Sequence, residues 1–414
     1  MTRILLRAHW LVPIVLLAGC GGGGGYGSSG GPPPPPPSAN SLALTIDAGP
    51  LPATHPTANT LYASVTICTP NSTSACQTID HVQVDTASYG LRIIGAVLNG
   101  AATPTPVTDP ATSNPLFECL QFADGYSWGS VVRVDVKLGG RTISSVPIHV
   151  LADAPSGVGA PAECKSGPAE NTVLAFGANG LLGVGTFIED CPACVNPGVT
   201  KAYYVCPGGT CANAAVSLAN QVQNPLPRLA ADNNGIVIQM PAVASPGSAT
   251  LNGALYFGIN TQSNNMLGAA SWILLNNGGE FTTSYEGITL LNSFADTGSN
   301  GYFFNKAAGD TVLVTCTTNT WAYCPTATTA KSGTIQSPID GAQRPVNFMV
   351  DNANMLFANY PTYTAFPNLA GPNSAPNAPS TSFDWGLPFF LGRPVFVLFE
   401  TKTVGTTTGP AIAF

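Results

Sequence analysis

Two seven-residue segments of this chain, 85–91 and 296–302, share Asp, Thr, Ser and Gly in the same register. Two aspartates brought to one site can do acid–base chemistry, because one carboxyl group keeps its proton while the other is ionised. A single segment of this kind would be interpreted as an ordinary Asx turn. Two matched copies in opposite halves of the chain favour a functional pair, Asp85 and Asp296.

Each segment lies between two apolar or alternating runs, a pattern that predicts strand, turn and strand. The first copy follows residues 81–84 and leads into 91–97. The second follows 290–295 and leads into 302–304. We therefore expect each aspartate to lie on a tight loop between two strands.

The composition favours an all-β secreted protein. The 414 residues include 45 Gly and 37 Pro, which disfavour long helices, and only 8% are charged. Removal of Arg3 and Arg7 with a leader leaves 12 basic residues against 21 acidic ones, so nucleic acid is excluded as a partner. Four His residues, one of them in the leader, leave little for a His triad or a multi-histidine metal site.

Residues 1–20 resemble a bacterial lipoprotein signal, because Arg3 and Arg7 precede a short apolar run that closes with Leu-Ala-Gly-Cys at 17–20. The resemblance implies that Cys20 is acylated and anchors the protein in the cell envelope, and Gly21 implies the outer membrane, on its periplasmic or surface face. The alternative is an ordinary signal peptide. Residues 21–40, a Gly/Ser stretch followed by six prolines, are expected to form a tether.

Without Cys20, ten cysteines remain, and an even number in an oxidising compartment favours five disulfides. Three pairs follow from proximity along the chain: Cys68–Cys76, Cys119–Cys164 and Cys316–Cys324. The other four form one cluster: Cys191, Cys194, Cys206 and Cys211. The spacing leaves the connectivity of this cluster open, and a structural zinc site is its alternative interpretation.

The segments Asp-Thr-Ala-Ser at 85–88 and Asp-Thr-Gly-Ser at 296–299, one in each half, resemble the active-site loop of the pepsin-like aspartic proteases, in which two apolar residues precede Asp-Thr-Gly-Ser. Further matches follow in that family's order: a flap hairpin and its outgoing strand at 125–140, a supporting segment at 179–185, a strand opening the second lobe at 253–259, and an apolar-apolar-Gly segment with the next strand at 388–399. The resemblance covers about residues 45–414. It implies an all-β, bilobal double-psi β-barrel architecture with an active-site cleft between lobes 41–225 and 226–414.

Segments 126–129 and 146–148 also resemble a family of bacterial lipoproteins known only as a domain of unknown function. The protease resemblance implies that Asp85 and Asp296 form the dyad that activates a water molecule, with no metal or cofactor. The supporting loop residues would be Thr86, Ala87, Ser88, Thr297, Gly298 and Ser299. The two threonines would exchange hydrogen bonds between the lobes, and the two serines would orient the outer carboxyl oxygens.

Two departures from the family bear on activity. Ala87 stands where the family has Gly, a position at which backbone amides approach the carboxyl groups closely. The flap candidates are Phe122, Tyr126 and Trp128, and counting back from residues 139–140 places Phe122 where the family has Tyr. The alternative is that these three aromatic side chains pack in the core of a β-sheet.

The first functional hypothesis is an envelope-anchored endopeptidase that hydrolyses peptide bonds in extended polypeptides. The second is a catalytically weak or inactive protease-like lipoprotein that binds a polypeptide or glycan at the envelope, which Ala87 favours. The third, an unrelated β-sandwich adhesin on a stalk, leaves the paired segments unexplained. Substrate preference, pH optimum and oligomeric state do not follow from the sequence.

Overall fold

The computed structural model describes residues 39–155, 157–196, 198, 201–373 and 381–414. Cys20 and residues 21–38 of the expected tether lie outside this part of the chain. Within it, no helix is long and apolar enough to cross a membrane.

The strands of the first half are β1 (Ser41–Ile46), β2 (Leu61–Cys68), β3 (Cys76–Asp85), β4 (Tyr89–Ile94), β5 (Thr105–Pro106), β6 (Leu116–Gln121), β7 (Tyr126–Leu138), β8 (Arg141–Leu151), β9 (Gly180–Val184), β10 (Tyr203–Val205) and β11 (Ala212–Asn213). Those of the second half are β12 (Gly235–Gln239), β13 (Leu251–Phe257), β14 (Trp272–Leu274), β15 (Phe281–Tyr285), β16 (Ile288–Ala295), β17 (Tyr302–Phe303), β18 (Thr329–Gln336), β19 (Gln343–Val350), β20 (Ala370–Gly371), β21 (Asp384–Trp385), β22 (Pro394–Leu398), β23 (Thr403–Val404), β24 (Thr407–Thr408) and β25 (Ala411–Ala413).

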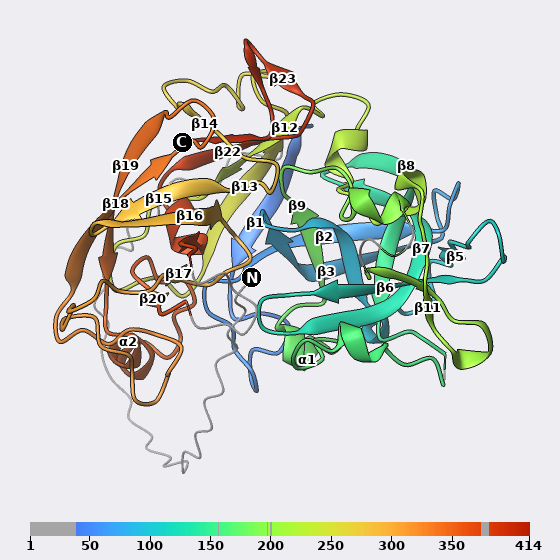
Figure 1. Ribbon diagram of the computed structural model, residues 1–414, viewed down its shortest axis with the longest axis horizontal. Coiled ribbons are helices and arrows are strands. Elements are labelled where there is room, and N and C mark those ends of the chain that lie inside the picture. Colours follow the sequence, from blue (N-terminus) through green and yellow to red (C-terminus); the bar gives the residue numbers. More distant parts are fainter. Residues whose placement is uncertain (1–38, 156, 197, 199–200, 374–380) are drawn as a thin grey trace, which may run out of the picture.

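The helices are α1 (Val173–Phe176) and α2 (Ala353–Asn359), and the 3-10 turns are η1 (Gly95–Val97), η2 (Ala162–Cys164), η3 (Pro192–Val195), η4 (Pro207–Gly209), η5 (Leu218–Asn220), η6 (Leu226–Arg228) and η7 (Leu387–Phe390). The fold is therefore all-β, as the composition predicts. Its two lobes lie side by side in Figure 1, with the first half of the chain coloured blue to green and the second half yellow to red.

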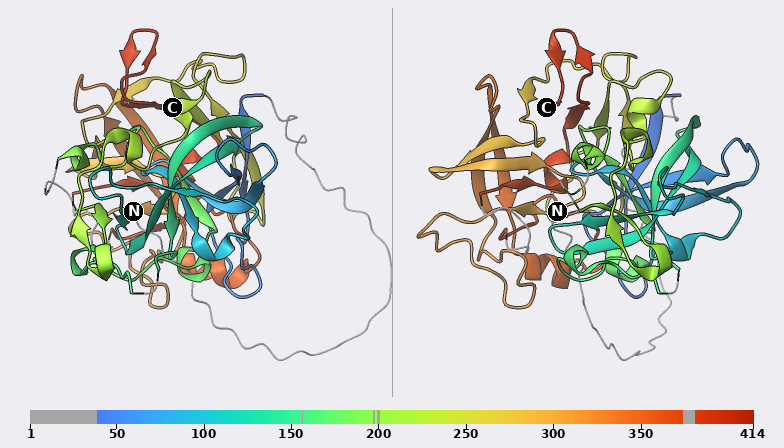
Figure 2. Two further views of the ribbon diagram at one scale, coloured as in Figure 1. Left: turned by 90° about the vertical axis from the view of Figure 1, so that its right-hand side faces the viewer. Right: turned by 45° about the vertical axis from the view of Figure 1, so that its right-hand side comes forward.

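A 16-stranded sheet runs through both lobes, and a seven-stranded sheet completes the second lobe. The lobes are joined by β1, which pairs antiparallel with β2 on one side and with second-half strand β13 on the other. Figure 1 shows β1 between the two halves, and the left view of Figure 2 shows the first lobe from its outer side. The largest apolar core is continuous across the junction, since it includes Val84 and Leu182 as well as Ile238 and Phe389.

The first aspartate lies at the end of a three-strand unit in which β9 is the central strand. β9 runs parallel to β3 and antiparallel to β4. In this register Asp85, the last residue of β3, is opposite Gly183. A Cβ at Gly183 would lie 2.5 Å from the backbone nitrogen of Tyr89, so the loop between β3 and β4 packs directly on a glycine.

The second aspartate lies in a unit of the same topology, with β21 as its central strand. β21 runs parallel to β16 and antiparallel to β17, and Asp296 directly follows β16. The next residue after β21, Gly386, takes the place of Gly183, since its Cβ would lie 2.1 Å from the carbonyl oxygen of Gly301. Two units of one topology thus hold the two repeated segments.

One sequence-based assignment in this unit is wrong. We expected residues 388–392 to supply the apolar-apolar-Gly segment of the second lobe, but Asp384, Trp385 and Gly386 occupy that place. Residues Leu387–Phe390 instead form the 3-10 turn η7. The expected strand that follows is present as β22. The assignment failed because a carboxylate is rarely buried in a central strand, so its presence hid the pattern.

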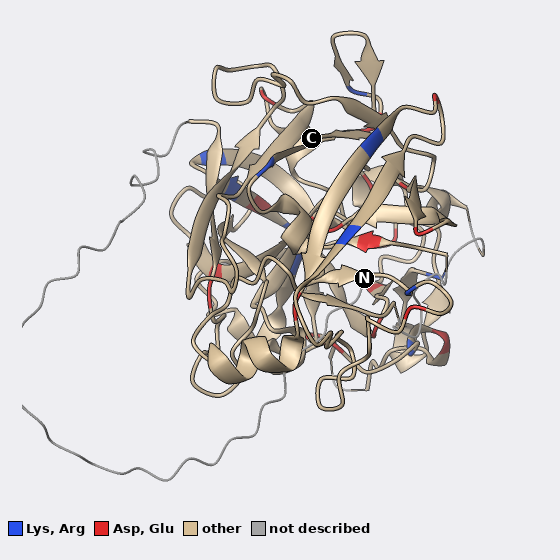
Figure 3. Ribbon diagram, turned by 90° about the vertical axis from the view of Figure 1, so that its left-hand side faces the viewer, with Lys and Arg blue, Asp and Glu red and all other residues tan. Residues whose placement is uncertain are grey.

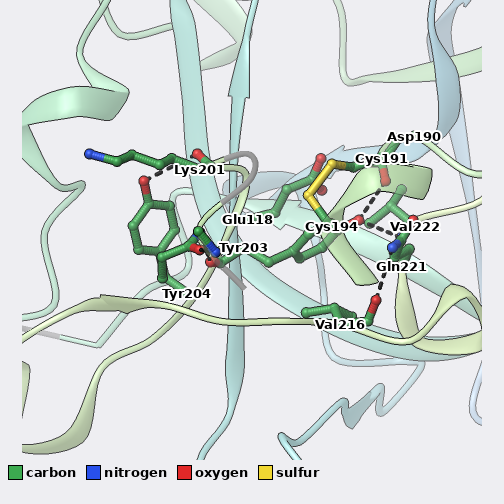
Figure 4. The surroundings of a disulfide bond; sticks show 12 residues. Glu118, Asp190, Cys191, Cys194, Lys201, Tyr203, Tyr204, Val216, Gln221 and Val222 are labelled. Atoms are coloured by element: carbon green, nitrogen blue, oxygen red, sulfur yellow. Dashed lines mark hydrogen bonds between the residues drawn. A yellow bond between two sulfur atoms is a disulfide. The ribbon is translucent and has the colours of Figure 1, made fainter. Parts of the chain in front are cut away.

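The described cysteines form five disulfides, including the three pairs expected from proximity: Cys68–Cys76, Cys119–Cys164 and Cys316–Cys324. In the cluster whose connectivity was open, Cys191 pairs with Cys194 and Cys206 with Cys211. The zinc interpretation is therefore wrong, because none of the four is a free thiolate. Figure 4 shows the Cys191–Cys194 bond beside Asp190 and Val222.

Charged residues are sparse and scattered along the ribbon (Figure 3). One buried group in the first lobe is an exception, in which Arg92 forms ion pairs with Glu118 at 2.8 Å and with Asp190 at 2.9 Å. His149 lies 3.0 Å from the second oxygen of Glu118, and Tyr203 donates to Asp190. This network ties β4, β6, β8 and β10 together.

Candidate active site

Asp85 and Asp296 meet at the junction of the two lobes, although 211 positions separate them in the chain. A Cβ built on Gly298 would lie 2.9 Å from Oδ1 of Asp85 and 2.9 Å from Oδ1 of Asp296, so both carboxyl groups border this glycine. The two carboxyl groups are close enough to interact electrostatically. Their residues are only 1% and 0% exposed, which places the pair in a nearly water-free environment.

The loop of each lobe holds its own carboxyl group with the same two donors. In the first loop, the Ala87 backbone amide donates to Asp85 Oδ1 at 2.8 Å and the Ser88 hydroxyl donates to Oδ2 at 2.6 Å. In the second, the Gly298 amide donates to Asp296 Oδ1 at 2.6 Å and the Ser299 hydroxyl to Oδ2 at 2.8 Å. The two carboxyl groups are thus fixed in equivalent orientations.

Thr86 and Thr297 bind the two loops to each other. The Thr86 amide donates to the Thr297 hydroxyl at 3.2 Å, and the Thr297 amide donates to the Thr86 hydroxyl at 3.0 Å. Each hydroxyl in turn donates to a backbone carbonyl of the opposite lobe, Thr86 to Ala295 at 2.9 Å and Thr297 to Val84 at 2.8 Å. The buried polar atoms of both threonines are therefore satisfied.

The two loops differ at the position between Thr and Ser. Gly298 has no room for a side chain, because its Cβ would lie 2.8 Å from Asp85 Cγ. Ala87 has room, because it borders a cavity at the lobe junction. The Ala87 amide still makes its hydrogen bond to Asp85, so the departure from the family's glycine leaves the support of the first carboxyl group in place.

The cavity beside Ala87 has a volume of about 210 Å³ and is lined by both lobes. Thr86, Ala87 and Tyr89 border it from the first lobe, and Phe294 and Ala295, just before Asp296, border it from the second. A cavity lined by residues adjacent to both aspartates can admit a side chain of a bound ligand next to the carboxyl pair.

The charges of the pair are coupled. Burial, together with the neighbouring carboxylate of Asp85 and a further one at Asp384, raises the pKa of Asp296 well above its ordinary value. Two carboxyl groups in one dry site cannot both ionise cheaply, so they hold one proton between them over a wide pH range. The direction of the shift assigns that proton to Asp296. The pair can therefore present one hydrogen-bond donor and one base to the same small molecule.

The three flap candidates all pack inside the first lobe. Phe122, in the turn between β6 and β7, contacts the Phe176 ring at 5.9 Å between ring centroids. Trp128 stacks on Phe117 at 5.5 Å and meets Tyr204 edge-on, and Tyr126 belongs to the same cluster. Their packing agrees with the core interpretation, and their role as a flap over the dyad stays a prediction.

Two polar residues of the site were not foreseen. Gln83 donates from Nε2 to the Gly298 carbonyl at 2.8 Å, a further contact between the lobes. Asp384, on β21, places a third carboxyl group near the dyad. Gln83 lies two residues before Asp85, so the spacing could have marked it. Asp384 could have been found by matching the triplet at 384–386 with that at 181–183.

The chain belongs to the family described as "Protein of unknown function (DUF3443)", whose model matches residues 36–414. No curated protein matches the chain. Among solved structures, it is similar to the aspartic proteinase from Irpex lacteus, with 16% sequence identity and a TM-score of 0.47, over 90% of this chain and 96% of that one.

Proposed function

We propose that this protein is an aspartic endopeptidase that hydrolyses peptide bonds with a water molecule activated by Asp85 and Asp296. One observation supports the proposal most strongly: two carboxyl groups from matched loops meet at one buried site, and each is held by the same backbone and hydroxyl donors. Burying two carboxyl groups with matched donors costs free energy, and a pair of this kind is the arrangement that acid–base catalysis by two aspartates requires.

The raised pKa of Asp296 divides the roles between the two residues. Asp296 carries the shared proton and donates a hydrogen bond to the scissile carbonyl oxygen, while ionised Asp85 takes a proton from the attacking water. The resulting hydroxide adds to the carbonyl carbon and forms a tetrahedral intermediate. The C–N bond then breaks as the amide nitrogen receives a proton from the pair, which returns the dyad to its starting charge.

The substrate proposed here is an extended polypeptide. A peptide bound as an added strand pairs through its backbone and directs alternate side chains into pockets. The cavity beside Ala87 and Phe294 would take one of these side chains. The lining includes the Tyr89 ring and apolar groups but also Thr186 and Glu280, so a side chain with an apolar body and a polar end suits it best.

The place of action proposed is the cell envelope. The lipoprotein-like leader with Cys20 supports an anchor in the outer membrane, and the residues that follow it support a tether that holds the lobes away from the bilayer. Palmitate labelling of the wild-type protein and a Cys20→Ser variant in cells tests this. Label on the variant would contradict the proposed anchor.

A peptide mixture incubated with the purified protein from pH 3 to 7 tests the peptidase proposal, with cleavage followed by mass spectrometry. We expect cleavage that a statine-type mimic of the tetrahedral intermediate blocks, because its hydroxyl group would sit between the two carboxyl groups. No cleavage at any pH by a folded, monodisperse sample would contradict the proposal.

A second function has its own support. Ala87 and the near-complete burial of both aspartates favour a protease-like lipoprotein that binds a polypeptide or glycan without cutting it. This proposal predicts that the peptide mixture or an envelope glycan binds to the wild-type protein and remains intact. Turnover of any bound peptide would contradict it.

A further inference from the structure

A third carboxyl group, that of Asp384, is buried in the second lobe next to the dyad. It is on β21, the central strand of the unit that holds Asp296, and it is 2% exposed. Its partners in register are Phe294 on β16 and Phe303 on β17. A carboxyl group between two phenylalanine positions is costly to bury, so its presence calls for an explanation.

The first lobe shows that the fold does not require a carboxyl group here. Leu181 on β9 occupies the equivalent place, since its partners in register are Gln83, two residues before Asp85, and Arg92, two residues after Gly90. Phe294 and Phe303 stand at the same distances from Asp296 and Gly301. Leu181 is fully buried, so an apolar side chain satisfies this position in one lobe and an aspartate replaces it in the other.

The surroundings of Asp384 connect it to Asp296 through one hydroxyl group. Among the described residues, neither carboxyl oxygen of Asp384 has a well-aligned hydrogen-bond partner. Its polar contact is with Ser299, whose hydroxyl donates to Asp296 Oδ2 at 2.8 Å. A serine hydroxyl has a single proton to donate. An ionised Asp384 therefore competes with Asp296 for that proton.

We propose that Asp384 is a positioning residue for the reaction proposed above: its negative charge, acting directly and through Ser299, keeps the shared proton on Asp296 and extends the working range of the dyad toward neutral pH. This inference rests on the proposed peptidase function. Both effects have the same sign, because a nearby negative charge and a contested hydrogen bond each disfavour ionised Asp296.

The pKa of the Asp384 carboxyl group supports this positioning role. Burial raises the pKa of Asp384 to about 7, with a smaller contribution from the charge of Asp85, while the contact with Ser299 opposes the rise. Asp384 therefore gains its negative charge as the pH approaches 7, and that charge disfavours loss of the proton from Asp296. The dyad works while it holds one proton, so a later loss of the proton from Asp296 widens the active range toward neutral pH.

The other titratable groups around β21 do not reverse the effect of Asp384 on the ionisation of Asp296. Asp85 faces it from the first lobe and Asp296 from the end of β16, and both are acidic. β17 contributes Tyr302, whose ring packs edge-on against Trp385 at 5.8 Å. Burial raises the pKa of Tyr302, so the side chain is neutral, and the nearby Arg393, which follows η7, only opposes this rise.

The test is the pH profile of kcat/KM for the wild-type protein and for Asp384→Asn, which keeps the shape of the side chain without its charge. We expect the alkaline limb of the variant to move down by about one pH unit, with the acidic limb unchanged. A limb that stays in place or moves up would overturn the inference.

Asp351→Asn is the matched control, because Asp351 is a buried carboxyl group of the same lobe, held by Ser245, Thr328 and Asn368. Its alkaline limb should stay with the wild type.

A second measurement does not need activity. The carboxyl carbons of aspartate, labelled with ¹³C, report each titration by NMR, and the signal lost in Asp296→Asn assigns that residue. We expect the midpoint of Asp296 to be lower in Asp384→Asn than in the wild type. This result without any peptide cleavage would support the inference and sink the peptidase proposal; cleavage with an unchanged midpoint would do the reverse.

Discussion

Thr86 and Thr297 each donate a backbone amide to the other's hydroxyl group, at 3.2 and 3.0 Å, across the junction of the two lobes. Because each threonine directly follows its aspartate, this exchange fixes the relative position of Asp85 and Asp296 more tightly than packing alone could. The spacing of the dyad thus depends on two hydroxyl groups, each of which is buried and fully satisfied.

Loss of either hydroxyl should destabilise the junction. Thr297→Ala removes the acceptor of the Thr86 amide and a donor to the Val84 carbonyl, and we expect the free energy of unfolding to fall by roughly 1–3 kcal/mol. Thr297→Ser keeps the hydroxyl and should lose clearly less. Urea unfolding followed by tryptophan fluorescence measures both. Equal losses for Ala and Ser would show that the methyl group, not the hydrogen bond, matters.

The two central loop positions should respond in opposite ways to small substitutions. Gly298→Ala places a methyl group within 2.9 Å of both Oδ1 atoms, so we expect kcat/KM to fall by about 100-fold or more. Ala87→Gly keeps the amide donor and should retain wild-type activity or exceed it. Steady-state kinetics on one cleaved peptide, with circular dichroism as the folding control, makes the comparison. Comparable losses at both positions would contradict the difference in space that the structure shows.

Asp384 should make the protein less stable as the pH rises. Its pKa is raised to about 7 in the fold from an ordinary value of 3.8, so the folded state binds a proton that the unfolded chain releases between these values. The stability that this proton contributes is complete below pH 4 and is lost as the pH passes 7. Relative to the wild type, Asp384→Asn should therefore gain stability between pH 4 and pH 8, on the order of 1–4 kcal/mol.

Asp310 provides the control of opposite sign for this experiment. Burial opposes its ionisation, but the hydrogen bond from Lys331 lowers the pKa of Asp310 to about 2. Its contribution to stability is present above pH 4 and is lost as the pH falls through 2, so Asp310→Asn should be less stable than the wild type at pH 8. Thermal unfolding of both variants at a series of pH values gives the two slopes. Parallel slopes would rule out the assigned charge states.

The disulfides should differ in their effect according to the length of chain they close. Cys119–Cys164 closes 45 residues and Cys68–Cys76 only eight, so chain entropy predicts losses of about 4 and 2.5 kcal/mol for the respective double serine variants. Thermal unfolding without reductant measures both. A larger loss for the shorter loop would mean that local strain or packing outweighs chain entropy here.

The sequence was most informative where interactions are local. The donors to Asp85 are two and three residues away in the chain, so the repeated segment carries the whole arrangement with it. The hairpin disulfides are local in the same sense. The Cys206–Cys211 bond at the β10–β11 hairpin is just as local, but four neighbouring cysteines allow three connectivities, and spacing alone does not choose among them.

Asp384 shows why the rest could not be predicted. Its role depends on contacts with Ser299 and the dyad, which lie 85 or more positions away in the chain and meet only in the folded unit of β16, β17 and β21. A buried central strand is expected to consist of apolar residues. The apolar pattern therefore favoured residues 388–392 over the triplet at 384–386, which begins with an aspartate. A residue that breaks a burial rule for a functional reason is invisible to that rule.

The central claim is that Asp85 and Asp296 perform the chemistry together, and kinetics of the two Asp→Asn variants test it most directly. Asparagine keeps the shape of each side chain but cannot exchange the proton. We predict that Asp85→Asn and Asp296→Asn each lower kcat/KM for a cleaved peptide by at least about 1,000-fold at the optimum pH, with unfolding temperatures close to wild type. Cleavage by either folded variant at the wild-type rate would contradict the account.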